Sequence, residues 1–155
     1  MITQQGGLSK AMMIRLHPVE DFIQGITAAC VAQGMQGGAV VSCIGSLQSA
    51  SFFTVVPLGN KIDAGYGDPI EMEGPLELVS AQRTIGLDVE GNLLIHMHGA
   101  LADGRGNLNG GHLLEGRCPV LITCEAMITF FEEARAIQKY DPETDMKLLT
   151  FVGTK

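Results

Sequence analysis

The sequence of 155 residues contains no tryptophan, only two tyrosines and six phenylalanines, and no run of basic residues. Proteins that bind single-stranded nucleic acid stack its bases on aromatic side chains, and binding to phosphates depends on clustered cations. Here ten lysines and arginines are scattered among seventeen acidic residues, which gives a net charge of −7. The composition therefore opposes autonomous DNA binding.

The chain also lacks the cysteine and hydrophobic patterns of several other protein classes. Its four cysteines form no CxxC pair, so we interpret them as reduced core residues rather than zinc ligands or disulfides. No apolar run is long enough to cross a bilayer, and the first residues lack the apolar segment of a signal peptide. We expect a cytoplasmic protein with no membrane contact, in which residues 1–11 form a flexible tail before a single domain at residues 12–155.

Charged residues are scarce, at 17% of the chain, whereas hydrophobic residues make up 46%. A monomer with so few charges would expose apolar surface to water. We therefore expect part of that surface to be buried against other subunits.

The hydrophobic pattern predicts a mainly antiparallel twisted sheet with one helix packed on it, an α+β domain. Apolar residues recur at helical spacing from Val19 to Cys30, with Pro18 ahead of them and Gly34 as a C-terminal cap. Residues 125–138 fit either a strand or a helix. Strands are predicted at residues 12–17, 37–45, 47–56, 74–89, 93–102, 108–114, 119–123 and 148–152.

Three of the four histidines fall within Leu93–Gly116, which reads as two strands joined by a turn. Because side chains alternate along a strand, His96 and His98 share one face, with their α-carbons about 6.7 Å apart. A turn at residues 103–106 returns the chain and places His112 opposite residues near His98. Glycines 110 and 111 could shift this register through a bulge.

Three converging imidazoles suit Zn or a similar divalent transition metal, with a fourth position left for water or a substrate. The alternative is that these histidines hydrogen-bond carbonyl groups or titrate at a subunit interface. Asp103, Asn109 and Glu115 could orient the ligands. Alternatively, Asp103 and Asn109 only form the turn, and Glu115 only lies at a solvated strand end.

Four motifs in this order and spacing resemble the prokaryotic PPC (Plants and Prokaryotes Conserved) domain over residues 13–151: GPLEL (74–78), HMHGALAD (96–103), GGHLLEG (110–116) and DPET (141–144). The resemblance implies a compact α+β fold, a homotrimer, a strand at residues 120–131, and metal binding by His96, His98 and His112. The family is often labelled DNA-binding because plant relatives carry AT hooks. This chain has no Arg-Gly-Arg-Pro sequence of that kind.

Three functions remain, and we rank them in the following order. The first is a homotrimeric interaction or regulatory module without turnover, whose partners are its own copies and other regulatory proteins, and whose metal orders the histidine hairpin. The second is a metal-dependent hydrolase or lyase that uses metal-bound water, with Glu77, Asp103 or Glu115 as the general acid or base. The third is direct DNA binding, which the net charge opposes.

Overall fold

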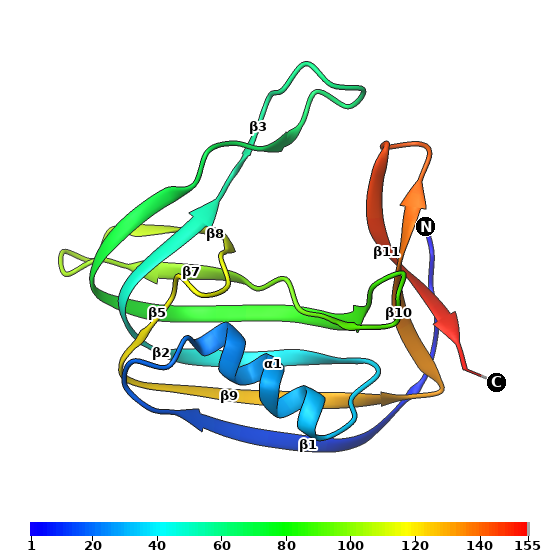
Figure 1. Ribbon diagram of the computed structural model, residues 1–155, viewed down its shortest axis with the longest axis horizontal. Coiled ribbons are helices and arrows are strands. Elements are labelled where there is room, and N and C mark those ends of the chain that lie inside the picture. The colour runs from blue at the N-terminus through cyan, green and yellow to red at the C-terminus, as the bar shows by residue number, and fades with distance from the viewer. Residues whose placement is uncertain (155) are drawn as a thin grey trace.

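The computed structural model describes residues 1–154 and contains a strongly curved sheet with one helix against it (Figure 1). Its elements are β1 (Gly7–Leu16), α1 (Phe22–Ala32), β2 (Gly38–Phe53), β3 (Val55–Val56), β4 (Gly65–Tyr66), β5 (Ile70–Leu87), β6 (Leu93–Leu94), β7 (His98–Ala102), β8 (Leu108–Leu113), β9 (Val120–Glu132), β10 (Ala134–Asp141) and β11 (Met146–Gly153). The predicted α+β class with a mainly antiparallel sheet is confirmed.

The main sheet has the strand order β1-β9-β2-β8-β7-β5-β10-β11, with β6 paired to β5 and a further direct pairing of β2 with β5. Strands β5 and β10 are parallel where they meet, and the remaining pairings are antiparallel. Strands β3 and β4 form a separate hairpin. This hairpin and the β10–β11 hairpin project from the same side of the curved sheet (Figure 1).

Helix α1 begins where Asp21 can cap it. One carboxylate oxygen of Asp21 accepts hydrogen bonds from the backbone N–H groups of Ile23 and Gln24, at 3.1 and 3.0 Å. Such a cap satisfies donors that have no partner within the helix. The chain leaves the helix through Gly34, whose positive φ of 62° suits a residue without a β-carbon. The cap predicted at Gly34 is therefore confirmed.

The helix packs on β1 and β9 through one apolar stripe. Phe22, Ile26 and Cys30 are completely buried in the core that α1 forms with these strands. The predicted stripe began at Val19, but Val19 lies before the helix and is exposed. Since the Asp21 cap starts the helix at Phe22, the prediction was three residues too long at this end.

Several predicted strands have different limits. The strands predicted at residues 37–45 and 47–56 merge into β2 as far as Phe53, because β2 remains paired with β9 across register shifts on either side of Gly45, whereas residues 55–56 form β3. Strand β1 begins at Gly7, within the expected tail, because residues 7–11 pair with the end of β9. The ambiguous residues 125–138 lie in strands β9 and β10. Each correction comes from pairing with a strand far away in the sequence.

Within residues 1–154, no helix has both the length and the apolar character required to cross a membrane.

Candidate functional site

The histidine hairpin forms with the register that the sequence predicts. His98 of β7 lies directly opposite His112 of β8, and the pairing continues without a bulge to the pair Ala102 and Leu108. The turn between them is closed by Asp103, whose carboxylate accepts hydrogen bonds from the backbone N–H groups of residues 105 and 107. Asp103 therefore has the turn-forming role rather than a place beside the histidines.

The three predicted histidines form one cluster, which we call the histidine cluster. The ring centroid of His112 is 5.0 Å from that of His98 and 5.1 Å from that of His96, and both pairs meet edge to face. His96 lies between β6 and β7, because the strand predicted at residues 93–102 is interrupted there. The interruption does not move its ring away from the cluster.

A tyrosine that the sequence analysis did not identify contacts the cluster. The hydroxyl of Tyr66 in β4 is 3.0 Å from Nδ1 of His112. The Tyr66 ring also stacks on Phe53 at the end of β2, with centroids 5.5 Å apart. Tyr66 lies outside the predicted strands, and no local pattern indicates that it reaches a histidine 46 residues further along the chain.

Burial and a nearby cation keep the histidine cluster uncharged. Burial, followed by the charges of His96, His98 and Arg83, lowers the pKa of His112 from 6.5 to about 4. Burial and the Arg83 charge also lower the pKa values of His96 and His98, and the charge of His98 acts further on His96. Neutral imidazoles are the form that binds a metal ion.

The present arrangement of the rings is not a formed metal site. Among residues 1–154, no three side chains of His, Cys, Asp or Glu are placed so that together they could hold a metal ion. The rings of His96, His98 and His112 therefore come together as predicted. They do not, however, have the geometry of metal ligands.

The carboxylates and amide expected to support the histidines lie elsewhere. Asn109 pairs with Leu101 in the hairpin and is exposed, and Glu115 is exposed after β8. Glu77 of β5 pairs with Ala102, at the far end of β7 from His98. No carboxylate belongs to the set of described residues that lines the cavity beside the histidines.

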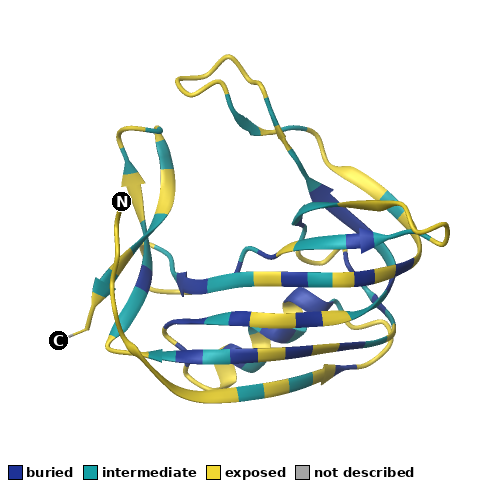
Figure 2. Ribbon diagram, turned by 180° about the vertical axis from the view of Figure 1, so that it is seen from behind, coloured by how far each residue is buried: buried dark blue, intermediate teal, exposed yellow. Residues whose placement is uncertain are grey.

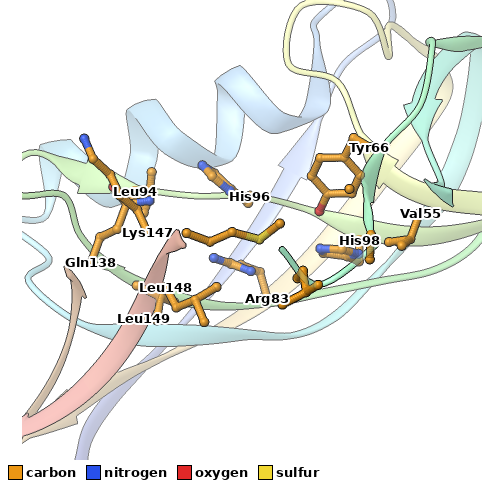
Figure 3. Close-up of a pocket in the computed structure, with 14 residues that line it drawn as sticks. Val55, Tyr66, Arg83, Leu94, His96, His98, Gln138, Lys147, Leu148 and Leu149 are labelled. Carbon is orange, nitrogen blue, oxygen red and sulfur yellow. The ribbon is translucent and has the colours of Figure 1, made fainter. Parts of the chain in front are cut away.

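That cavity, which we call the Arg83 pocket, has a volume of about 470 Å³. Its lining residues come mainly from β5 and from the β3–β4 and β10–β11 hairpins. Figure 3 shows Arg83 within it, with His96 and His98 on one side and Leu148 and Leu149 of β11 on the other. Arg83 is the second contributor that sequence reasoning missed, because one arginine within a predicted strand gives no signal.

Comparison with known proteins matches this chain to one family and to one group of curated relatives. Residues 3–132 match the family of the Plants and Prokaryotes Conserved (PCC) domain. The chain is 28% identical over 138 residues to the bifunctional protein GlmU of two Synechococcus strains, and the match spans 89% of this chain but a fifth of those proteins.

Three solved structures share the fold. A metal-containing protein from Archaeoglobus fulgidus, AF0104, has a TM-score of 0.82 and 21% identity, with 96% of this chain and 99% of that chain covered. A plant- and prokaryote-conserved protein from Pyrococcus horikoshii has a TM-score of 0.78 and 21% identity, with 96% and 97% covered. A candidate DNA-binding protein from Ralstonia eutropha has a TM-score of 0.73 and 23% identity, with 88% of each chain covered. At these identities the likeness establishes the architecture.

Proposed function

Because this chain belongs to the family of Plants and Prokaryotes Conserved (PCC) domains, we propose that it is a homotrimeric interaction module that binds a divalent transition metal at His96, His98 and His112. One observation carries the metal proposal: the ring of His112 lies 5.0 and 5.1 Å from the other two rings. The metal-containing neighbour from Archaeoglobus fulgidus is consistent with this proposal.

The spacing of the rings fits a tetrahedral ion. Two imidazoles bound to one zinc ion, with Zn–N distances of about 2.0–2.1 Å, have their ring centroids about 5 Å apart. The distances from His112 to His96 and to His98 match that value. We expect rotation of the rings about χ2, a broad torsion in histidine, to aim their nitrogens at the ion when it binds.

Tyr66 would fix the tautomer of one ligand. A histidine that binds a metal through one nitrogen commonly directs the other to a hydrogen-bond partner. In this protein Nδ1 of His112 meets the Tyr66 hydroxyl at 3.0 Å, which leaves Nε2 for the ion. The stacking of Tyr66 on Phe53 holds the tyrosine ring in place.

A metal held by three imidazoles would retain an open position, where it can acidify a bound water. An enzyme would also need a general acid or base within reach of that water. Of the candidates, Asp103 serves its own turn, and neither Glu77 nor Glu115 lines the Arg83 pocket. We therefore rank the hydrolase or lyase alternative below a structural and regulatory role for the metal.

Elemental analysis of purified protein tests the metal site. We expect one equivalent of zinc or a similar metal in the wild type and at least a tenfold lower content in His98→Ala. His17→Ala is the matched control, because His17 is the fourth histidine, is exposed and lies outside the cluster. Equal metal content in all three proteins would refute the site.

The trimer proposal rests on an apolar face that α1 does not cover. Met127 of β9 lies between the buried residues Ala126 and Ile128, so it points away from the core. It pairs with Met13 of β1 and shares a groove with Ile44 of β2. Met13 is 83% exposed and Ile44 is 50% exposed. Figure 2 shows exposed positions along β1, β9 and β2 on this side.

An uncovered apolar face of this kind is typical of surfaces that subunits bury against one another. Light scattering of Met127→Glu tests the proposal, because a charge at a packed interface costs several kcal/mol when it is desolvated without a partner. We expect a trimer for the wild type and a monomer for this variant. Val89→Glu, which adds the same charge in the exposed turn after β5, should stay trimeric. A monomeric wild type would refute the proposal.

We do not extend the DNA-binding name of the Ralstonia eutropha neighbour to this chain. The net charge of −7 would be tripled in a trimer and would repel phosphates. We expect no mobility shift of random duplex DNA at physiological salt. A tight complex whose affinity falls steeply with added salt would contradict this expectation.

A further inference from the structure

Arg83 is a half-buried cation with one unsatisfied hydrogen-bond donor. Its Nε lies beneath the surface with no hydrogen-bond acceptor in the described part of the chain. Burial lowers the pKa of Arg83, because the guanidinium loses water that favours its charged form. An unsatisfied donor of a charged group is costly, and an anion placed against Arg83 would remove that cost.

The pocket around Arg83 is positive although the protein as a whole is negative. Two cations, Arg83 and Lys147, are among the fourteen described residues that line it, and those residues include no Asp or Glu. The whole chain, in contrast, has seventeen acidic and ten basic residues. The Arg83 charge also lowers the pKa of each histidine in the cluster, so its field extends over this wall of the pocket.

The wall of the pocket beyond Arg83 is mainly apolar. Leu94, Met146, Leu148 and Leu149 line the wall beyond Arg83. A volume of about 470 Å³ falls within the range of small-molecule sites, which combine apolar walls with a few placed polar groups. Inorganic ions would leave most of this wall in contact with water, whereas an organic ligand would cover it.

We propose that the Arg83 pocket binds a small organic anion, with its carboxylate or phosphate group at the guanidinium of Arg83 and its apolar body against the leucines of β11. The planar guanidinium suits either oxyanion because it can donate two parallel hydrogen bonds. The proposal depends on Arg83 and the pocket walls. It stands whether or not the histidine cluster holds a metal.

Calorimetric titration with four probes tests the ligand class. Octanoate and octyl phosphate supply the two oxyanions on one apolar chain, and the tighter of them identifies the preferred head group. Octylamine carries the same chain with the opposite charge and should not bind. Inorganic phosphate lacks the chain and should bind at least tenfold more weakly. Equal affinity for octylamine, or for inorganic phosphate, would overturn the proposal.

Variants test the role of Arg83. We expect Arg83→Gln to weaken binding of the better probe at least tenfold, whereas the matched control Arg105→Gln, in the exposed turn after β7, should bind like the wild type. Leu148→Asp places a negative charge on the pocket wall at a residue that is 43% exposed and should also weaken binding. This second variant decides the question if Arg83→Gln does not fold. Unchanged binding by a folded Arg83→Gln protein would overturn the proposal.

The same titration on chelator-treated protein separates this inference from the metal proposal. Binding that persists after chelation and remains sensitive to Arg83→Gln supports the pocket, even if elemental analysis finds no metal. Binding that disappears on chelation and is insensitive to Arg83→Gln would place the anion on the metal and overturn the inference.

Discussion

Gly111 of β8 lies against the end of β2, and replacing it with alanine would test how tightly the histidine hairpin is held. A β-carbon at this position would lie 2.2 Å from the backbone oxygen of Phe53 and 3.3 Å from the ring of Phe52. The nearer atom is backbone, so a side-chain rotation cannot relieve the clash. Either β8 or the end of β2 must move, and the adjacent His112 moves with it.

The expected cost is that of overpacking a closely packed interior, about 1–3 kcal/mol in the free energy of unfolding. For a chain of this length each kcal/mol corresponds to about 2–4 °C in Tm. We therefore expect Gly111→Ala to melt at least about 2 °C below the wild type. It should also lose metal, because a ligand moved by a few tenths of an ångström no longer meets its two partners.

Gly104→Ala is the matched control for this experiment. Gly104 belongs to the turn of the same hairpin, but an added β-carbon there has no atom within 4 Å and its φ is not positive. Its stability should stay within about 0.5 kcal/mol of the wild type, as for most surface substitutions. Thermal unfolding by circular dichroism measures both variants. If Gly111→Ala were as stable as Gly104→Ala and kept its metal, the rigid placement of His112 would be refuted.

Two further predictions concern the helix and the histidines. Asp21→Ala removes the hydrogen bonds that cap the helix at Ile23 and Gln24 and a 2.8 Å hydrogen bond to the backbone of Cys118. Urea unfolding should show a loss of about 1–2 kcal/mol in the free energy of unfolding. An unchanged urea midpoint would contradict the role of the cap. In metal-free protein, burial lowers the pKa of His112 from 6.5 to about 4. Between pH 6.5 and 4 the unfolded chain therefore binds more protons than the folded protein. Stability should therefore be fully present above pH 6.5 and fall as the pH drops towards 4. In His112→Gln the urea midpoint should fall less, and an identical pH profile would count against the burial of His112.

The histidine hairpin could be predicted because the patterns that form it lie between residues close together in the sequence. Alternation places His96 and His98 on one side of a strand, and a turn of the type found at Asp103 returns the next strand in register. The capped helix was predictable for the same reason, since Asp21 and Gly34 lie within a few residues of its ends. Its first residue was misplaced because an apolar Val19 happened to continue the spacing.

The remaining contributors to the site depend on long-range pairing. Tyr66 reaches His112 because β3 and β4 form a hairpin that projects from the end of β2. Arg83 reaches the leucines of β11 because β10 pairs in parallel with the end of β5. Neither contact leaves a periodic pattern in the sequence. The strand structure of residues 125–138 has the same origin, because β9 pairs with β1 and β2, and β10 pairs with β11.

The metal and the organic anion, if both bind, must influence each other through charge. Arg83 lowers the pKa of all three histidines, so it also disfavours a cation bound among them. An anion at Arg83 would offset that repulsion and raise the metal affinity. Because linkage is reciprocal for binding free energies, the metal must raise the affinity for the anion by the same factor. Titrating zinc with and without the better octyl probe, and the probe with and without zinc, should give two equal ratios above one. In Arg83→Gln the metal affinity should rise and the coupling should vanish, whereas a ratio of one in the wild type would show that the two sites do not share a field.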